Sequence, residues 1–381
     1  MIQTMSEPKK TKYNLHSPEA RALIDEIVHG TFVKEGTMVA FPTCFPGAST
    51  PIPADESRIT ALDITPEGII YGGTSGRASH LFVAMFHGVT GVVFDRGIVE
   101  GADHCAAVCC GKNGFAACVN GPEGGRVVGG HLQPLPFDLI QEWGFSRTPF
   151  RDYGKVQNEP MVHAVMTESR STLVGMTTGH LFTLALDEGK LQVAGEVPGH
   201  GRIVAGSKNG VFGQDGPSHL WRYDPGSRQI QRRAVRLPDG AWEKTPLSWA
   251  RDPRNGLAYT ADADGHLFSF DEERGFQGPL GRTLLAPVGP SAVTHDGRLF
   301  GFCGAEMAKL FCYHPGLKQV TNLGVAVSVL ERRRYGYVFG DAVTGRDGQI
   351  VFGENDDLGH LWLYFPRILS SQRGKPMDSG A

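Results

Sequence analysis

One short phrase recurs along most of this 381-residue chain, and its spacing constrains the fold more than any other feature. The copies read SHLF, GHLQ, GHLF, SHLW, GHLF, AKLF and GHLW, and their second residues are His80, His131, His180, His219, His266, Lys309 and His360. Successive copies are 51, 49, 39, 47, 43 and 51 residues apart. Repeats of roughly 40–50 residues are typical of β-propeller blades.

Each copy of this phrase, the marker, lies between two strand-like segments. A short apolar run with glycine precedes it, as in IIYGG or RLFGF, and an alternating run such as WRYDP follows it. Strand, turn and strand are therefore expected around every marker. The pattern predicts an all-β, seven-bladed β-propeller whose markers occupy equivalent places. The expected blades span residues 59–98, 104–139, 161–197, 202–237, 246–285, 291–325 and 335–365.

Composition agrees with this fold and excludes some partners. The 51 glycines and 24 prolines suit a large β body with many tight turns. A formal net charge of -3 gives no electrostatic reason to bind nucleic acid or an anionic membrane. The first twelve residues lack an apolar segment and no run of eighteen apolar residues occurs, so we expect a cytoplasmic protein without a membrane span. The seven cysteines, four of them between Cys105 and Cys118, suggest buried thiols rather than a disulfide framework.

Three regions are expected along the chain. Residues 1–30 form an N-terminal extension with a short helix over residues 18–29, which Ser17 caps and Gly30 ends. Residues 31–367 form the propeller, and residues 368–381 form a polar tail. The alternating segment 31–43 is expected to complete the last blade, because closing the ring removes an exposed sheet edge.

One long irregular insertion, residues 141–160, separates the second and third expected blades. Long ordered loops in compact repeats are often functional. This one mixes aromatic residues such as Trp143 and Tyr153 with Arg147, Arg151 and Lys155. We expect it to be ordered and to overhang the mouth of the central channel.

Histidines are the first candidates for chemistry. Six markers carry one, and six copies at one structural position indicate a role in building the blade. His80 is the candidate exception, because its approach, GGTSGRASH, is longer than its counterparts and includes Arg77. His104 and His163 lie outside the marker series, where inner strands are expected to begin beside the channel. A satisfied structural histidine remains the alternative for each.

The order of His80, His104, Tyr153 and Arg170, with the phrase GGTSGRASHLF on the first blade, resembles the seven-bladed propeller polysaccharide lyases of the ulvan lyase and rhamnose-glucuronate lyase type. The resemblance implies β-elimination at a uronic acid residue of an acidic oligo- or polysaccharide. It gives the acid–base roles to His80, His104 and Tyr153, and the contact with the carboxylate to Arg170, with Arg151 as the rival.

The chemistry itself requires such residues. Charge accumulates on the uronate carboxylate as the α-proton leaves, and a guanidinium that pairs with both oxygens lowers that barrier. A group with a pKa near neutrality can then move the proton. The sugar needs contacts as well, and the candidates for them are Arg77, Trp143, Arg151, His163, Trp249 and Tyr335.

 The aromatic candidates are therefore Trp143, Trp249, Tyr335 and Tyr337, each of which can equally be a core residue of a propeller.

No metal or other cofactor is expected. Cys303, Cys312 and His314 lie around the sixth marker without the paired spacing of a zinc site. The acidic run at Glu354, Asp356 and Asp357 favours a solvated loop over a calcium site. The leading hypothesis is thus a carbohydrate lyase, and its alternative is a non-catalytic propeller scaffold that binds a protein or a glycan.

Overall fold

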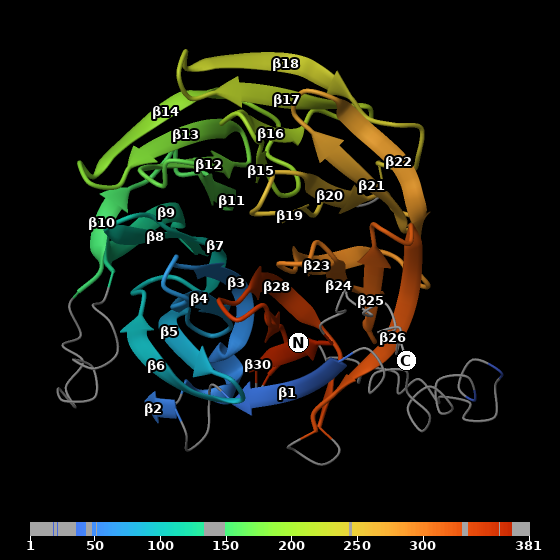
Figure 1. The fold of residues 1–381 in the computed structure, drawn as a ribbon. Coiled ribbons are helices and arrows are strands. Elements are labelled where there is room, and N and C mark those ends of the chain that lie inside the picture. Colours follow the sequence, from blue (N-terminus) through green and yellow to red (C-terminus); the bar gives the residue numbers. More distant parts are fainter. Residues whose placement is uncertain are drawn as a thin grey trace, which may run out of the picture.

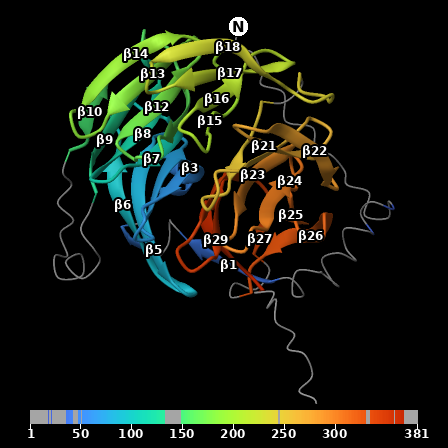
Figure 2. The same cartoon turned by 45° about the horizontal axis from the view of Figure 1, so that its top comes forward.

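The computed structural model describes residues 36–42, 48–50, 52–132, 149–243, 246–329, 334–357 and 359–367, together with Pro18 and Arg21. Its strands form seven sheets of four or five strands. The sheets stand side by side around one central axis, as the two views show (Figures 1 and 2). The prediction of an all-β, seven-bladed propeller is confirmed. No helix in these ranges is long and apolar enough to cross a membrane.

The first four blades follow the chain. Blade one contains β3 (Arg58–Ile64), β4 (Ile70–Ser75), β5 (His80–His87) and β6 (Thr90–Ile98). Strand β2 (Ala48–Thr50) pairs parallel with β6, and the 3-10 turn η1 (Ala54–Glu56) lies between β2 and β3. Blade two contains β7 (His104–Cys110), β8 (Gly114–Gly121), β9 (Gly124–His131) and β10 (Arg151–Gly154). Blade three contains β11 (Met161–Met166), β12 (Thr172–Thr177), β13 (His180–Ala185) and β14 (Lys190–Glu196). Blade four contains β15 (Val204–Ala205), β16 (Val211–Gln214), β17 (His219–Asp224) and β18 (Gln229–Arg236).

The last three blades complete the ring. Blade five contains β19 (Ala250–Arg251), β20 (Ala258–Ala261), β21 (His266–Asp271) and β22 (Gly275–Arg282). Blade six contains β23 (Val288–Val293), β24 (Leu299–Cys303), β25 (Lys309–His314), β26 (Gln319–Val327) and β27 (Tyr335–Gly336). Blade seven contains β28 (Phe339–Thr344), β29 (Ile350–Glu354), β30 (His360–Pro366) and, from the other end of the chain, β1 (Gly36–Pro42).

Strand β1 closes the ring, as predicted for the alternating segment near the N-terminus. It pairs antiparallel with β30 from Gly36 opposite Pro366 to Pro42 opposite His360. Met38 is fully buried in the apolar cluster between blades six and seven. This pairing covers an edge of blade seven that would otherwise expose unpaired backbone groups.

The markers fall at equivalent places in six blades. His80, His180, His219, His266, Lys309 and His360 are each the first residue of the third strand of a blade. His131 is instead the last residue of β9, so the prediction is wrong for blade two. There the first residue of the third strand is Gly124, which lies opposite Gly121. Gly124 has a φ of +92°, and a Cβ on it would lie 2.5 Å from the Asn158 carbonyl oxygen, so no side chain fits.

The insertion after blade two also differs from the prediction. Its residues 151–154 form β10, which pairs with β9 and is the outermost strand of that blade. Figure 1 shows β10 at the outer edge of the ring rather than over the channel. Tyr153 packs there against the apolar cluster between blades two and three, and this contact gives the segment its place. Residues 133–148, which include Trp143, lie outside the described residues, as do the tail and most of the expected N-terminal helix.

Strand direction divides the molecule into two faces. Neighbouring strands in a blade are antiparallel, so the first and third strands of a blade run in the same direction. The third strands begin at the marker residues, and the inner strands therefore begin on that same side. We call this side the marker face, and the side where the inner strands end the opposite face.

Candidate functional site

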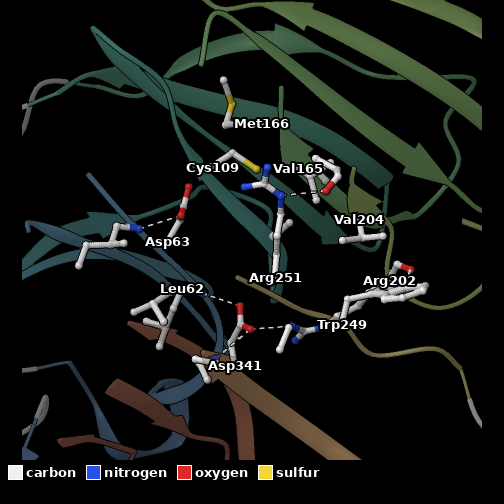
Figure 3. A pocket seen from close by; sticks show the side chains of 18 of the residues that line it. Leu62, Asp63, Cys109, Val165, Met166, Arg202, Val204, Trp249, Arg251 and Asp341 are labelled. Carbon is white, nitrogen blue, oxygen red and sulfur yellow. Dashed lines mark hydrogen bonds and ion pairs between the residues drawn. The ribbon is translucent and has the colours of Figure 1, made fainter. Parts of the chain in front are cut away.

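A cavity of about 530 Å³ occupies the central channel. The inner strands of all seven blades line it, namely β3, β7, β11, β15, β19, β23 and β28. Figure 3 shows side chains from several blades converging on this space. Concave sites with a few converging polar groups are the usual places for small-molecule binding.

The cavity lies in the half of the channel nearer the opposite face. In each blade, the first lining residue lies two or three residues before the last residue of the inner strand, and these residues are Leu62, Ala107, His163, Arg202, Trp249, Ser291 and Asp341. From this layer the cavity extends to residues beyond the strand ends, such as Glu168, Arg170 and Pro253. Its polar groups therefore belong to the opposite face.

Hydrogen bonds between blades fix several of these side chains. Inner strands have a free edge toward the channel, and their backbone groups need partners. Asp63 of blade one accepts hydrogen bonds from the backbone N–H groups of Cys110 in blade two, at 2.6 Å, and of its own neighbour Ile64, at 2.8 Å. The packing of blade one against blade two, which brings β3 beside β7, thus also sets the position of the Asp63 carboxylate.

Asp63 is a carboxyl group of the cavity whose pKa is raised. Burial of the carboxyl raises the pKa of Asp63 to about 6, although hydrogen bonds from Cys110 and Ile64 and the charge of Arg170 act in the opposite direction. Each carboxylate oxygen has more than one lone pair, so accepting one backbone N–H leaves it able to accept another donor. A carboxyl group with this pKa can exchange a proton near neutral pH.

Two guanidinium groups lie toward the mouth of the cavity. Arg170, in the turn after β11, donates from Nη1 to the carbonyl oxygen of Ile64 at 3.1 Å. Arg251, at the end of β19, donates from Nε to the Ala205 carbonyl oxygen at 2.9 Å and pairs with Glu168 at 2.6 Å. Arg170 of blade three therefore reaches the inner strand of blade one, and Arg251 of blade five is held by the inner strand of blade four. Arg170 is the arginine whose charge acts on Asp63.

A third arginine crosses the channel. Arg202, just before β15 in blade four, pairs with Asp341 of blade seven at 2.5 Å and donates to the Gly340 carbonyl oxygen at 2.7 Å. Blades four and seven are not neighbours in the ring, as Figure 1 shows. Asp341 is held in turn by the backbone N–H groups of Leu62, at 2.8 Å, and Ala342, at 3.0 Å. Figure 3 shows this ion pair at one end of the space.

His163 is a fixed neutral donor in this layer. Its Nδ1 accepts a hydrogen bond from the backbone N–H of Ile203 at 3.3 Å. Burial, with a contribution from Arg202, holds the pKa of His163 well below its ordinary value. The neutral ring then carries its proton on Nε2, which makes this nitrogen a hydrogen-bond donor.

Three residues predicted for the site thus line the cavity. They are Arg170, His163 and Trp249. Trp249 is buried and donates from Nε1 to the Arg202 carbonyl oxygen at 3.0 Å, so it supports the crossing arginine. Cys109 also lines the cavity, and burial keeps the pKa of its thiol well above its ordinary value.

His80 lies elsewhere, in a buried cluster on the marker face. Its Nε2 lies 2.7 Å from Glu56 Oε2, and its Nδ1 lies 3.0 Å from Asp95 Oδ1. Burial acts against a charged ring, but hydrogen bonds and charges of Asp95 and Glu56 outweigh it and raise the pKa of His80. Arg77, predicted to bind substrate, pairs with Glu56 at 2.5 Å and extends this cluster to the surface.

His104 also lies on the marker face, as the first residue of β7. Its Nδ1 is 2.8 Å from Ser75 Oγ, and burial lowers the pKa of its ring. The two histidines of the predicted set therefore share one face, whereas Arg170 lies on the other.

The remaining predicted residues lie on outer parts of the blades. Tyr153 and Arg151 are in β10, where the Arg151 guanidinium lies 5.0 Å from the centre of the Tyr153 ring. Burial raises the pKa of Tyr153. Tyr335 is in β27 and stacks against Tyr337. The structure therefore does not bring His80, His104, Tyr153 and Arg170 together in one site.

The sequence reasoning missed Asp63, Arg202, Arg251 and Asp341. Asp63 and Asp341 interrupt otherwise apolar inner strands, RITALDI and FGDAVT. A charged residue inside such a strand was the available signal, because buried carboxylates require partners. Across the ranges that the structure describes, no group of three or more His, Cys, Asp or Glu side chains could hold a metal ion.

Comparisons with known proteins support the fold alone. No protein-family model matches the chain, and no curated protein matches it. Among solved structures, virginiamycin B lyase from Staphylococcus aureus is similar with a TM-score of 0.61 and 9% identity, over 86% of this chain and 99% of that one. A second structure of that lyase, a catalytically inactive variant with quinupristin, gives a TM-score of 0.59 at 9% identity.

A further solved structure resembles this chain less closely. The extracellular domain of a one-component system from B. thetaiotaomicron has a TM-score of 0.52 and 13% identity, over 84% of this chain and 39% of that one. At such identities, a shared propeller fold does not carry over the activity of either protein. A lyase is therefore known on a similar fold, but its substrate and residues belong to that protein.

Proposed function

We propose that the channel cavity is the active site of a lyase that cleaves a uronate-containing oligo- or polysaccharide by β-elimination. The observation that carries this proposal is a carboxyl group with a pKa of about 6, Asp63, beside the guanidinium of Arg170 in a cavity of about 530 Å³. Elimination next to a carboxylate needs these two functions, a proton carrier and a fixed positive charge.

Arg170 binds the uronate carboxylate in this proposal, as the sequence resemblance implied. Its guanidinium donates one described hydrogen bond, to Ile64, and has five N–H groups in all. A planar fork of donors can pair with both carboxylate oxygens. As the α-proton leaves, negative charge develops on the carboxylate, and the fixed guanidinium stabilises it.

Asp63 moves the proton. As a carboxylate, it takes the proton from the carbon next to the uronate carboxyl group, and the electron pair of that C–H bond forms the new C=C bond. The bond from the neighbouring carbon to the glycosidic oxygen breaks, and that oxygen leaves with its electron pair. Protonated Asp63 then returns the proton to the oxygen, so the carboxylate is regenerated. A pKa of about 6 suits a group that must act first as base and then as acid.

His163 orients the sugar. Its neutral ring presents the Nε2–H group as a donor, because Nδ1 already accepts the Ile203 N–H. A neutral imidazole is a poor proton source, so we give it hydrogen bonding to a sugar hydroxyl rather than proton transfer. The similarity in fold to a protein named as a lyase supports the proposal only at the level of the fold.

The test is an activity screen against paired substrates. Uronate-containing glycans of several linkages and their carboxyl-reduced counterparts are incubated with the protein, and the ultraviolet absorbance of an unsaturated uronate is followed. We expect absorbance to rise with at least one uronate glycan and with none of the reduced ones, because the reduced sugars cannot pair with Arg170. No rise with any uronate glycan would overturn the proposal and favour the alternative, a non-catalytic propeller.

A further inference from the structure

The lining of the cavity lies in one half of the channel. Its lining starts, in every blade, at the layer that contains His163, Arg202 and Asp341, and it continues toward the opposite face. The first residues of the longer inner strands, such as Arg58, His104 and Met161, are not part of this lining. The described lining of the cavity thus extends toward the opposite face and not toward the marker face.

The Arg202–Asp341 ion pair forms the floor of this pocket. It joins blades four and seven across the channel, and the side chains are only 25% and 14% exposed. Both partners are anchored, because Asp341 accepts two backbone N–H groups and Arg202 donates to a backbone carbonyl oxygen. Breaking a largely buried ion pair is costly, since each charge would be left without its partner. The floor is therefore a fixed part of the fold.

The groups assigned to catalysis lie between this floor and the mouth. Asp63 is the last residue but one of β3, and Arg170 follows the end of β11. A sugar bound against both lies between the ion pair and the opposite face. A chain that continued toward the marker face would have to pass the Arg202–Asp341 ion pair, which crosses the channel.

We propose that the site accepts only the end of a glycan chain, so that the protein releases short products from chain ends rather than cutting within the chain. This inference rests on the proposed lyase function and specifies its substrate. The volume of about 530 Å³ agrees with it, because pockets of roughly 300–1,000 Å³ enclose small ligands rather than polymers.

The test follows product length during the first turnovers on a long uronate glycan. Products are separated by size and detected by the absorbance of the unsaturated uronate. We expect short products of one length from the start, while the remaining polymer shortens slowly. Intermediate lengths early in the reaction would overturn the end-acting site but leave the lyase function intact. A lack of any absorbance would overturn both.

A matched substrate sharpens this test. The same glycan is prepared with bulky groups attached at both ends and is compared with the unmodified glycan at equal concentration. We expect the blocked glycan to lose at least about a hundredfold in initial rate, since neither end can enter the pocket. An unchanged rate on the blocked glycan would contradict the inference, because cleavage within the chain needs no free end.

Discussion

The imidazole of His80 lies between two carboxylates, and this contact defines what the residue can do. Both ring nitrogens have a partner, Glu56 on one side and Asp95 on the other, and the side chain is 4% exposed. The long segment before His80, which includes Gly76 and Arg77, contributes to the same cluster, because Arg77 pairs with Glu56. Gly76 has a φ of +156° and packs so closely on the Asp55 carbonyl oxygen that a Cβ would lie 2.1 Å from it. The inserted residues thus build a buried ionic cluster in blade one.

Replacing His80 should therefore affect stability much more than replacing His266. His266 has a similar contact, with Asp262 at 3.0 Å, but its side chain is 38% exposed. Removing one partner of a buried ionic cluster costs roughly 3–5 kcal/mol, whereas an exposed pair contributes about 1 kcal/mol or less. We expect His80→Ala to lower the free energy of unfolding by the larger amount and His266→Ala by the smaller.

Denaturant unfolding of the two purified variants beside the wild type measures this difference. The two variants are matched, because each histidine starts the third strand of its blade. Equal losses of stability would show that the two carboxylates around His80 add nothing to what a single marker contact provides.

Several site residues could be predicted from their sequence context, and others could not. Arg170 and His163 were found from the resemblance and from their place beside an inner strand. Asp63 and Arg202 gave no recognisable motif, because their roles depend on strands that are far apart in the chain. Arg202 meets Asp341 139 residues away, and Asp63 meets the backbone of Cys110 47 residues away. Such pairs exist only after the blades have packed together.

At the scale of elements, the repeat predicts the seven blades but misplaces the marker and the outer strand of blade two. In that blade glycine replaces the marker, and the outer strand β10 follows only after residues 133–148. The recurring phrase cannot locate the third strand of this blade, since Gly124 and Gly125 at its start do not resemble the other markers. Strand β1 could be predicted for two reasons. The alternation of apolar and polar residues in its segment indicates a strand, and an open ring needs one more strand to complete its last blade.

Closure of the ring by β1 leads to a prediction about two adjacent residues. Met38 is fully buried between blades six and seven, while the neighbouring Thr37 is exposed. Met38→Asp would place an unpaired carboxylate in an apolar cluster, so we expect a loss of about 3 kcal/mol or more in stability. Thr37→Asp puts the same group into water and should change stability by less than about 0.5 kcal/mol.

Hydrogen exchange adds a readout that is specific to closure. In Met38→Asp, the amides of β30 should lose protection before those of β8 and β12, because β1 pairs only with β30. Uniform loss of protection in all blades would mean that β1 has no separate role in holding the ring closed.

At the scale of the whole molecule, strand direction places the candidate residues on two faces of one channel. His80 and His104 lie on the marker face, and Asp63 and Arg170 lie toward the opposite face. Sequence order cannot reveal this division, because each blade contributes residues to both faces within about ten positions. We assign the chemistry to the opposite face, where the cavity lies.

One measurement tests that assignment most directly, namely kcat/KM as a function of pH for the wild type, Asp63→Asn and His104→Gln on a uronate glycan that the wild type cleaves. The wild-type value should fall as pH decreases through about 6, since the base is the ionised form of Asp63. We expect Asp63→Asn to lose roughly a hundred- to ten-thousand-fold in kcat/KM, and His104→Gln, whose residue lies on the marker face, to keep nearly all of it. Full activity in Asp63→Asn together with its loss in His104→Gln would contradict the account and move the active site to the marker face.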